Sequence, residues 1–300
     1  MIPVPLSKTW LLLALLMPGA LRAAEPTVLA PGATLKLLGE GYQFTEGPSA
    51  DKDGNVYFTD QPNDRIVRWD AATGAFSDWM KPSGRANGTY FDAAGNLLAC
   101  ADEKNQLWSI APDRKVTVLV SDLGGKLFNG PNDLWIRPDG GLYFTDPLYK
   151  RPYWQRDPAS QQTGQHVYFL PKGGTPRAVA SDLTQPNGII GTPDGKTLYV
   201  ADIGAGKTYA YDIQSDGSLA GKRLFCESGS DGMTLDTEGN VYLTGKGVLV
   251  FDRTGKRIEQ IAVPQGWTAN VTFGGRNRDL LFITAGTAVY GIQTRVKGAQ

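Results

Sequence analysis

The stretch EGPSADKDGNVYFTD, residues 46–60, joins a short strand to a second strand through a tight turn at Asp53-Gly54. An Asp-Gly pair between two apolar segments is a strong local signal for a hairpin. The same arrangement recurs along the chain, with a polar residue opening the first strand of each repeat. These polar residues are Glu46, Asn87, Asn132, Asn187, Asp231 and Asn270. In five of the six repeats a glycine follows eight residues later, at Gly54, Gly95, Gly140, Gly195 and Gly239.

The period of this repeat predicts the fold. Successive polar residues are 39 to 55 residues apart, which is the length of a four-stranded propeller blade. The sequence therefore predicts an all-β, six-bladed β-propeller of four-stranded blades. The sixth repeat, residues 270–292, lacks a clear outer strand, and we expect residues 34–38 to supply it. This closure by an N-terminal strand would cover the last exposed strand edges.

The N-terminal segment differs from the repeats. Lys8 precedes an apolar run over residues 10–17, and small residues follow near Ala23. This pattern is typical of a secretory signal peptide and predicts an exported protein, periplasmic or secreted. The apolar run is too short for a stable membrane span. We expect a signal peptide over residues 1–23 and one propeller domain over residues 24–300.

Charge and cysteine content limit the partners. The chain has 30 basic and 30 acidic residues, and without residues 1–23 it has 28 basic residues. A slightly acidic chain is a poor candidate for binding nucleic acid. Its two cysteines, Cys100 and Cys226, fall in different repeats, so we expect two buried free thiols. The sequence does not predict the oligomeric state.

In a propeller, the residues that open the first strands converge on the axis at one face. The loops between second and third strands surround the same face, and the longest of them covers residues 147–165. We interpret this segment as a lid or wall over the channel mouth, since long loops in compact domains are commonly functional. The alternative is a plain surface insertion.

The six polar residues would form an oxygen-rich ring. Two of them, Glu46 and Asp231, are carboxylates, and the others offer amide oxygens. Such a set suits a hard divalent cation, Ca²⁺ first, with Mg²⁺, Mn²⁺ or Zn²⁺ as alternatives. Asn and Asp also satisfy backbone groups in ordinary turns. A cation is favoured because carboxylates buried at an axis are costly without one.

Several motifs resemble the gluconolactonase, senescence marker protein (regucalcin) and luciferin-regenerating enzyme family, a group of six-bladed propellers. The motifs are EGP (46–48), NGPNDL (129–134), YFTDP (143–147), PNG (186–188), PDGKTLYVAD (193–202) and SDGM (230–233). Together they span essentially the whole chain after the N-terminal segment. The resemblance implies a metal-dependent hydrolase that opens a sugar lactone.

The resemblance also implies roles for individual residues. Glu46, Asn187 and Asp231 would hold a calcium-type ion, and Asn132 would be a further ligand or a substrate contact. Asp231 would also be the catalytic general base. The substrate, a small lactone, would lie against Asn87, Asn132 and Asp133. An ion that polarises the lactone carbonyl and a carboxylate that deprotonates water make this chemistry reasonable.

Two features bear on the alternatives. His166 is the only histidine, and we expect it to be structural rather than a member of a serine triad. Where many bacterial gluconolactonases carry Glu-His-Gly, residues 101–105 read ADEKN, which leaves the lactone unspecified. Cations expected near the ring face are Lys104, Lys150, Arg151, Lys207 and Lys246, which would suit an anionic lactone. Hydrolysis of other esters or phosphotriesters, or non-catalytic binding of a sugar or protein, remain alternative hypotheses.

Overall fold

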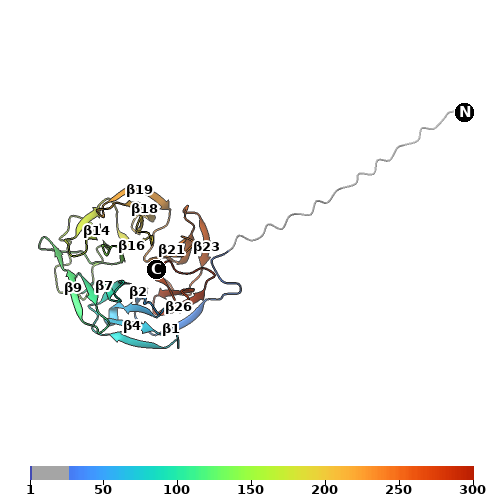
Figure 1. The fold of residues 1–300 in the computed structure, drawn as a ribbon, viewed down its shortest axis with the longest axis horizontal. Helices are drawn as coiled ribbons and strands as arrows, with labels where there is room; N and C mark the ends of the chain where they lie inside the picture. Colours follow the sequence, from blue (N-terminus) through green and yellow to red (C-terminus); the bar gives the residue numbers. More distant parts are fainter. Residues whose placement is uncertain (2–26) are drawn as a thin grey trace.

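The computed structural model describes Met1 and residues 27–300, so the predicted signal peptide lies outside the described residues. The described strands form six four-stranded antiparallel sheets arranged as blades around a central axis (Figure 1). Among the described residues, the only helical element is one short 3-10 turn, η1 (Gln61–Asn63). The prediction of an all-β, six-bladed propeller is confirmed. None of the described segments is a helix long and apolar enough to cross a membrane.

Each blade runs from an inner strand near the axis to an outer strand at the rim, as β2 and β19 show in Figure 1. Blades 1 to 3 are β2 (Thr45–Ala50), β3 (Val56–Asp60), β4 (Arg65–Trp69) and β5 (Phe76–Met80); β6 (Ala86–Phe91), β7 (Leu97–Ala101), β8 (Gln106–Ile110) and β9 (Val116–Val120); and β12 (Leu134–Ile136), β13 (Leu142–Asp146), β14 (His166–Leu170) and β15 (Arg177–Ala180).

The second half of the ring follows the same plan. Blades 4 to 6 are β16 (Pro186–Gly191), β17 (Thr197–Asp202), β18 (Lys207–Ile213) and β19 (Leu219–Cys226); β20 (Met233–Leu235), β21 (Val241–Gly245), β22 (Gly247–Phe251) and β23 (Arg257–Ile261); and β24 (Thr268–Gly274), β25 (Leu280–Ala285), β26 (Ala288–Gln293) and β1 (Lys36–Glu40). A small hairpin, β10 (Asp122–Leu123) and β11 (Lys126–Leu127), lies between blades 2 and 3 in the sequence.

The sixth blade is closed by the N-terminal strand, as predicted. β1 pairs antiparallel with β26, and Lys36 lies opposite Gly291. The strand begins two residues later than expected because residues 29–33 first turn against the end of β26. There the Ala30 N–H donates to the Gln293 carbonyl over 3.1 Å, and the Ala33 N–H donates back to Ala30.

Apolar side chains pack between neighbouring sheets and leave the axis to polar groups. Val56 and Phe58 of blade 1 pack against Phe282 of blade 6, and comparable clusters join the other blades. Burying one such side chain contributes about 1.5–3 kcal/mol. Cys100 and Cys226 are free and buried within this packing, as predicted. The inner strands are therefore held from behind while their first residues face the channel.

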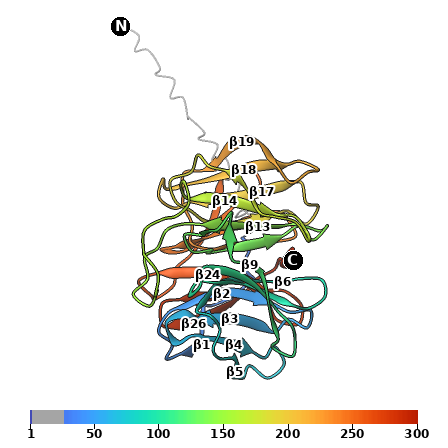
Figure 2. The same ribbon diagram turned by 90° about the vertical axis from the view of Figure 1, so that its left-hand side faces the viewer.

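The C-terminal tail covers the channel at the end opposite the ring residues. Figure 1 places the C-terminus near the axis, and Figure 2 shows the stacked blades from the side. The Ala299 N–H donates to the Leu235 carbonyl over 3.0 Å, and the Thr237 N–H donates to Lys297 over 2.8 Å. Gln300 lines a small cavity of about 20 Å³ in the channel. The ring is thus open on one face only.

Candidate functional site

The six ring residues stand where the sequence predicts them, at or just before the start of each inner strand. Glu46, Asn87, Asn187 and Asn270 lie within the inner strands β2, β6, β16 and β24. Asn132 and Asp231 precede β12 and β20 by two residues. All are buried except Asp231, which is partly buried.

Threonines on the second strands hold one blade to the next at this level. The Thr59 hydroxyl donates to the carbonyl of Asn87 over 3.1 Å, and the Thr145 hydroxyl donates to the carbonyl of Asn187 over 2.7 Å. Thr244 makes the corresponding bond to Ala269, next to the last ring residue, over 2.8 Å. From the preceding blade, the first two bonds fix the backbone of a ring residue, and the third fixes the residue before Asn270.

Glycines let the inner strands approach closely. A Cβ added to Gly47 would lie 2.0 Å from the carbonyl oxygen of Asn87, and one added to Gly232 would lie 1.9 Å from the Asn270 side chain. Both contacts are far below van der Waals distance, so a larger residue would push neighbouring blades apart. The small residues beside the ring positions set its diameter.

A polar pocket of about 310 Å³ opens over the ring. Its floor is made by ring residues, and its walls come from loops at the same face. The lining residues are Glu46, Asn87, Asn132 and Asp231 of the ring, with Phe44, Tyr149, Arg151, Gln185, Ile203 and Trp267. Residues that are 185 positions apart in sequence, such as Glu46 and Asp231, therefore meet in one site.

The carboxylate of Asp231 is held by two donors. Asn187 Nδ2 donates to Asp231 Oδ1 over 2.8 Å, and Trp267 Nε1 donates to Oδ2 over 2.5 Å. The same Asn187 amide also donates to the Tyr149 hydroxyl over 3.0 Å. Both partners bind the amide nitrogen of Asn187, and its oxygen, Oδ1, has no hydrogen-bond partner among the described residues.

Glu46 is held in a similar way. Its Oε2 accepts hydrogen bonds from the Gly47 N–H and, over 3.1 Å, from Asn270 Nδ2. The Asn270 oxygen in turn accepts the Val271 N–H over 2.8 Å. Asn270, for which the sequence offers only a structural role, thus orients the Glu46 carboxylate.

Burial makes both carboxylates costly to ionise, and repulsion by neighbouring carboxylates adds to the cost for Glu46. Burial raises the pKa of Glu46 well above its usual range, and the nearby Asp231 and Asp133 carboxylates raise it further. Burial raises the pKa of Asp231 to about 6, while the bonds from Trp267 and Asn187 limit the rise. A cation between these carboxylates would remove the repulsion and favour their charged forms.

The ring fits a hard cation. The Oδ1 atoms of Asn87 and Asn187 are buried and have no hydrogen-bond partner among the described residues. A buried acceptor without a partner is costly, and a cation would satisfy it. Within residues 27–300, no three His, Cys, Asp or Glu side chains cluster as a metal site, so an ion here would need amide oxygens as well as carboxylates. This donor set suits calcium or magnesium better than zinc.

Asp133 lies beneath the ring. It lines the small cavity of about 20 Å³ together with Asn270 and Met233. Burial raises the pKa of Asp133 to about 7, and its Oδ1 accepts the Leu134 N–H over 2.9 Å. Asn87 and Asn132, by contrast, line the pocket itself. The predicted substrate contacts of all three residues stay predictions.

The long loop over residues 147–165 forms one wall of the pocket through Tyr149 and Arg151. The loop is tied to the blades by many hydrogen bonds. Arg156 Nε donates to Asn105 Oδ1 over 2.7 Å, and Trp154 Nε1 donates to the Asp102 carbonyl over 2.9 Å. Of the cations expected near this face, Arg151 lines the pocket, and Lys104, Lys150, Lys207 and Lys246 are not among its lining residues.

His166 is packed in the third blade, away from the pocket. Its imidazole packs against the Tyr168 side chain, with the two ring centroids 5.8 Å apart, and its Nε2 lies 3.0 Å from the Thr163 hydroxyl. Burial lowers the pKa of His166. These contacts agree with the structural role that the sequence indicates.

The sequence reasoning missed four pocket residues, Phe44, Gln185, Ile203 and Trp267. Phe44 and Gln185 lie two positions before the ring residues Glu46 and Asn187, and Trp267 lies three before Asn270. In extended chain, residues two apart face the same side. The position two before each ring residue was therefore a usable signal for Phe44 and Gln185. Nothing in the sequence pattern singles out Trp267.

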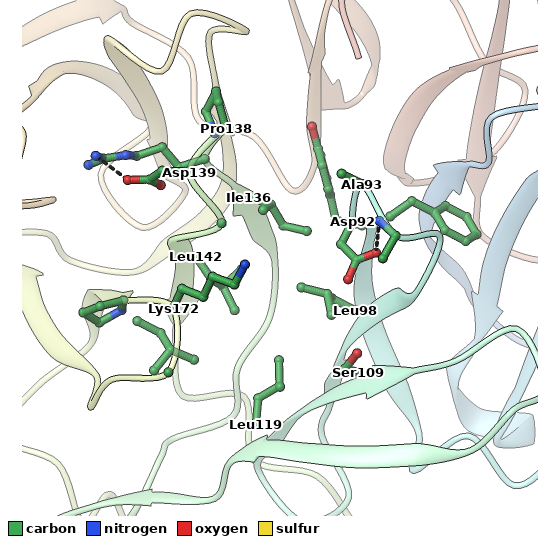
Figure 3. Close-up of a pocket in the computed structure, with 18 of the residues that line it drawn as sticks. Asp92, Ala93, Leu98, Ser109, Leu119, Ile136, Pro138, Asp139, Leu142 and Lys172 are labelled. Carbon is green, nitrogen blue, oxygen red and sulfur yellow. Dashed lines mark hydrogen bonds and ion pairs between the residues drawn. The ribbon is translucent and has the colours of Figure 1, made fainter.

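A larger cavity, of about 600 Å³, lies between blades 2 and 3 on the other face of the molecule (Figure 3). Its walls are mostly apolar, with Leu98, Leu119, Ile136 and Leu142 facing the space. It contains none of the ring residues. We call it the interblade cleft.

Residues 44–287 match the SMP-30/Gluconolactonase/LRE-like region. The chain belongs to this family. A gluconolactonase from Zymomonas mobilis is 26% identical over 300 aligned residues, with 90% of this chain and 84% of the relative covered. The pentonolactonase XacC from Haloferax volcanii is 27% identical, with 80% of each chain covered. The solved structure of a gluconolactonase from Xanthomonas campestris has a TM-score of 0.82 at 28% identity, with 89% of this chain and 91% of that one covered.

Proposed function

We propose that the protein is a metal-dependent hydrolase that opens a sugar lactone. The observation that carries the proposal is one open pocket lined by the carboxylates of Glu46 and Asp231 and by Asn87, whose amide oxygen has no partner. Asn187, with a second unpartnered oxygen, donates to Asp231 beside them. Its family membership and the lactonases among its relatives support the reaction type. The fold alone would not, because propellers serve many functions.

Glu46, Asn187 and Asp231 are the proposed ligands, with Asn132 as a further ligand or a substrate contact. Calcium is the proposed ion because the donors are all oxygens, two from carboxylates and the others from amides. When bound, the ion would polarise the lactone carbonyl and stabilise the negative charge that develops on its oxygen. Asn270 keeps Glu46 in place for this role through its 3.1 Å hydrogen bond.

Asp231 is the proposed general base. It lines the pocket, and the bonds from Trp267 and Asn187 orient its carboxylate. Its ionised carboxylate can take a proton from an attacking water. The proton then passes to the alkoxide oxygen that leaves when the ring opens. No nucleophilic side chain is needed.

The remaining pocket residues would orient the substrate. Burial and the nearby Asp231 raise the pKa of Tyr149 to about 12, so its hydroxyl keeps its proton and can donate to a substrate oxygen. Asn87 and Asn132 present amide groups on the floor. Phe44, Ile203 and Trp267 supply apolar surface against the sugar ring.

The test is a lactonase screen of the purified protein with glucono-, galactono- and pentonolactones, before and after chelator treatment. Hydrolysis that is lost with the chelator and restored by Ca²⁺ supports the proposal. E46Q and D231N, which keep side-chain shape, should lower metal affinity measured by calorimetry and turnover together. Turnover that survives in both variants would contradict it. Activity on aryl esters or phosphotriesters only would favour the alternative hydrolase, and no activity at all would favour a binding protein.

We also propose that the protein is exported, on the basis of residues 1–23 alone. Expression of the full chain in a bacterial host should yield a periplasmic protein whose N-terminus, read by mass spectrometry, begins near Ala24. Retention of the intact N-terminus in the cytoplasm would overturn this proposal.

A further inference from the structure

An aspartate is the last residue of the second strand in blades 1, 3 and 4 and directly follows that strand in blade 2. The aspartates of blades 1, 3 and 4 make the same kind of hydrogen bond. Asp60 accepts the N–H groups of Gln43 and Phe44, at 3.0 and 3.3 Å. Asp146 accepts those of Asn129 and Gly130, both at 2.9 Å. Each fixes the segment that enters the inner strand of its own blade.

Asp202 completes this group of three. It accepts the N–H groups of Thr184 and Gln185, both at 2.8 Å. Its carboxylate, like those of Asp60 and Asp146, thus fixes the backbone that leads to a ring residue. This pattern gives an internal standard for a purely structural aspartate at this position.

Asp102, in the second blade, departs from the pattern. Its carboxylate accepts no backbone N–H from the described chain. The entering segment is held by Asp64 instead, which accepts the N–H groups of Ser83 and Arg85 at 2.9 and 2.8 Å. The Asp102 carboxylate accepts bonds from the long loop: Arg151 Nε at 2.9 Å and the Tyr153 hydroxyl at 2.5 Å. Its carboxylate is buried, so both bonds are well shielded from water.

The arginine that pairs with Asp102 also differs from its counterpart in blade 1. Arg65 uses every guanidinium nitrogen: Nε and Nη2 donate to Asp60 at 3.0 and 2.9 Å, and Nη1 donates to Asp78 at 2.9 Å. Arg151 donates to Asp102 through Nε alone. Its two terminal nitrogens donate to no described residue, although the side chain lines the pocket.

We propose that Arg151, positioned by Asp102, binds a free carboxylate on the substrate, so that the preferred substrate is a lactone of an acidic sugar. This inference rests on the proposed function. A guanidinium with two free terminal nitrogens matches the two oxygens of a carboxylate. Arg151 is the only cationic side chain among the described residues that line the pocket. The guanidinium carbon lies 5.4 Å from the centroid of the Tyr149 ring, which keeps the guanidinium at the wall.

The arrangement also divides the pocket by chemistry. The ring carboxylates and their ion would engage the lactone carbonyl on the floor. Arg151 comes from the wall and would engage the far end of the same molecule. Asp102 touches no substrate in this scheme and is a positioning residue, because it holds Nε and so aims the terminal nitrogens.

The test compares two lactones that differ only at the far carbon, D-glucaro-1,4-lactone, with a carboxylate, and D-glucono-1,4-lactone, with a hydroxymethyl group. The wild-type protein should have the higher kcat/KM for the acidic lactone. R151Q should lose roughly 30- to 100-fold in kcat/KM for that lactone and less than about fivefold for the neutral one. D102N should raise KM for the acidic lactone with a smaller effect on kcat.

R65Q is the matched control, because Arg65 pairs with the corresponding aspartate of blade 1. It should lower the melting temperature and leave the ratio between the two lactones unchanged. Equal losses on both lactones in R151Q, or a wild-type preference for the neutral one, would overturn the inference.

Binding of both lactones to D231N and to the D231N/R151Q double variant, measured by calorimetry, separates this inference from the proposed function. If no lactone is hydrolysed but the acidic one binds through Arg151, the proposed reaction fails and the carboxylate site stands. If lactones are hydrolysed with no preference that depends on Arg151, the proposed reaction stands and the inference about Arg151 fails.

Discussion

The pocket over the ring holds about 310 Å³ and the interblade cleft about 600 Å³, yet the smaller space carries the features of a reactive site. In the pocket, Glu46 and Asp231 have raised pKa values, and amide oxygens lack partners. In the cleft, the Asp92 carboxylate is used by its own turn, where it accepts the N–H groups of Ala94 and Asn96. Volume does not locate the chemistry in this fold; unsatisfied polar groups do.

The strongest test of this contrast replaces one aspartate in each region. We expect D231N to lower kcat/KM for lactones by about 10³-fold or more, because it removes the charge of a proposed ligand and the proposed general base. D92N keeps the turn's main acceptor and should stay within about twofold of wild type. Steady-state kinetics at saturating Ca²⁺ provide the measurement. A D231N protein that retains a tenth of wild-type activity would exclude Asp231 as the base.

A second test removes the side chain that orients the proposed ligand Glu46. N270A takes away the amide that donates to Glu46 Oε2 over 3.1 Å. Loss of such a supporting contact costs about 10- to 100-fold in metal affinity. We expect this loss in calorimetric titrations with Ca²⁺, with turnover recovering at high Ca²⁺. N270D, which would repel Glu46 while keeping the shape, is the informative companion. Unchanged affinity in N270A would show that Glu46 is held by other contacts.

Acid should weaken metal binding. Protons compete with the ion for Glu46 and Asp231, and in the metal-free protein both have raised pKa values, that of Asp231 about 6. The binding-competent, ionised forms are therefore favoured at high pH and lost as pH falls through these values. We expect affinity to fall by about tenfold per pH unit for each proton displaced. Calorimetry between pH 5 and 8 in buffers of different ionisation enthalpy counts those protons, and a flat affinity would contradict the assignment.

The smallest effect is expected in the cleft. Leu119 is 39% exposed at its edge, and L119S removes apolar surface without touching the ring. We expect kcat/KM to be unchanged and the free energy of unfolding to change by less than about 1 kcal/mol. Urea denaturation and lactone kinetics provide the two measurements. A changed kcat/KM would mean that the cleft is coupled to the pocket.

The fold could be predicted because the sequence repeats its own signal. Each blade has a polar residue at the start of its inner strand, and in five of the six a hairpin glycine follows eight residues later. An ambiguous strand in one repeat can therefore be assigned by comparison with the other repeats. The closing strand was predicted two residues early because the turn of residues 29–33 against β26 is a tertiary contact. Local sequence carries no trace of such a contact.

The site could be predicted only at its floor. The repeat predicts the positions of the ring residues, but the pocket walls come from loops that are not repeated, so no comparison between blades predicts them. Arg151 was expected near the face, and its pairing with Asp102 depends on contact between residues 49 positions apart. Asp133 follows Asn132 directly, and consecutive residues in extended chain face different ways. Sequence order alone therefore could not tell the pocket from the cavity beneath it.

Closure of the sixth blade by β1 links the site to the order of synthesis. β1 belongs to the earliest described part of the chain, and its partner β26 ends at Gln293. Glu46, made early, receives its hydrogen bond from Asn270, made late. During translation the Glu46 carboxylate, a proposed ligand, therefore stays without this hydrogen bond until nearly the whole chain has left the ribosome. A product that stops before β24 would have five blades and two open edges, and Glu46 would lack the amide that orients it.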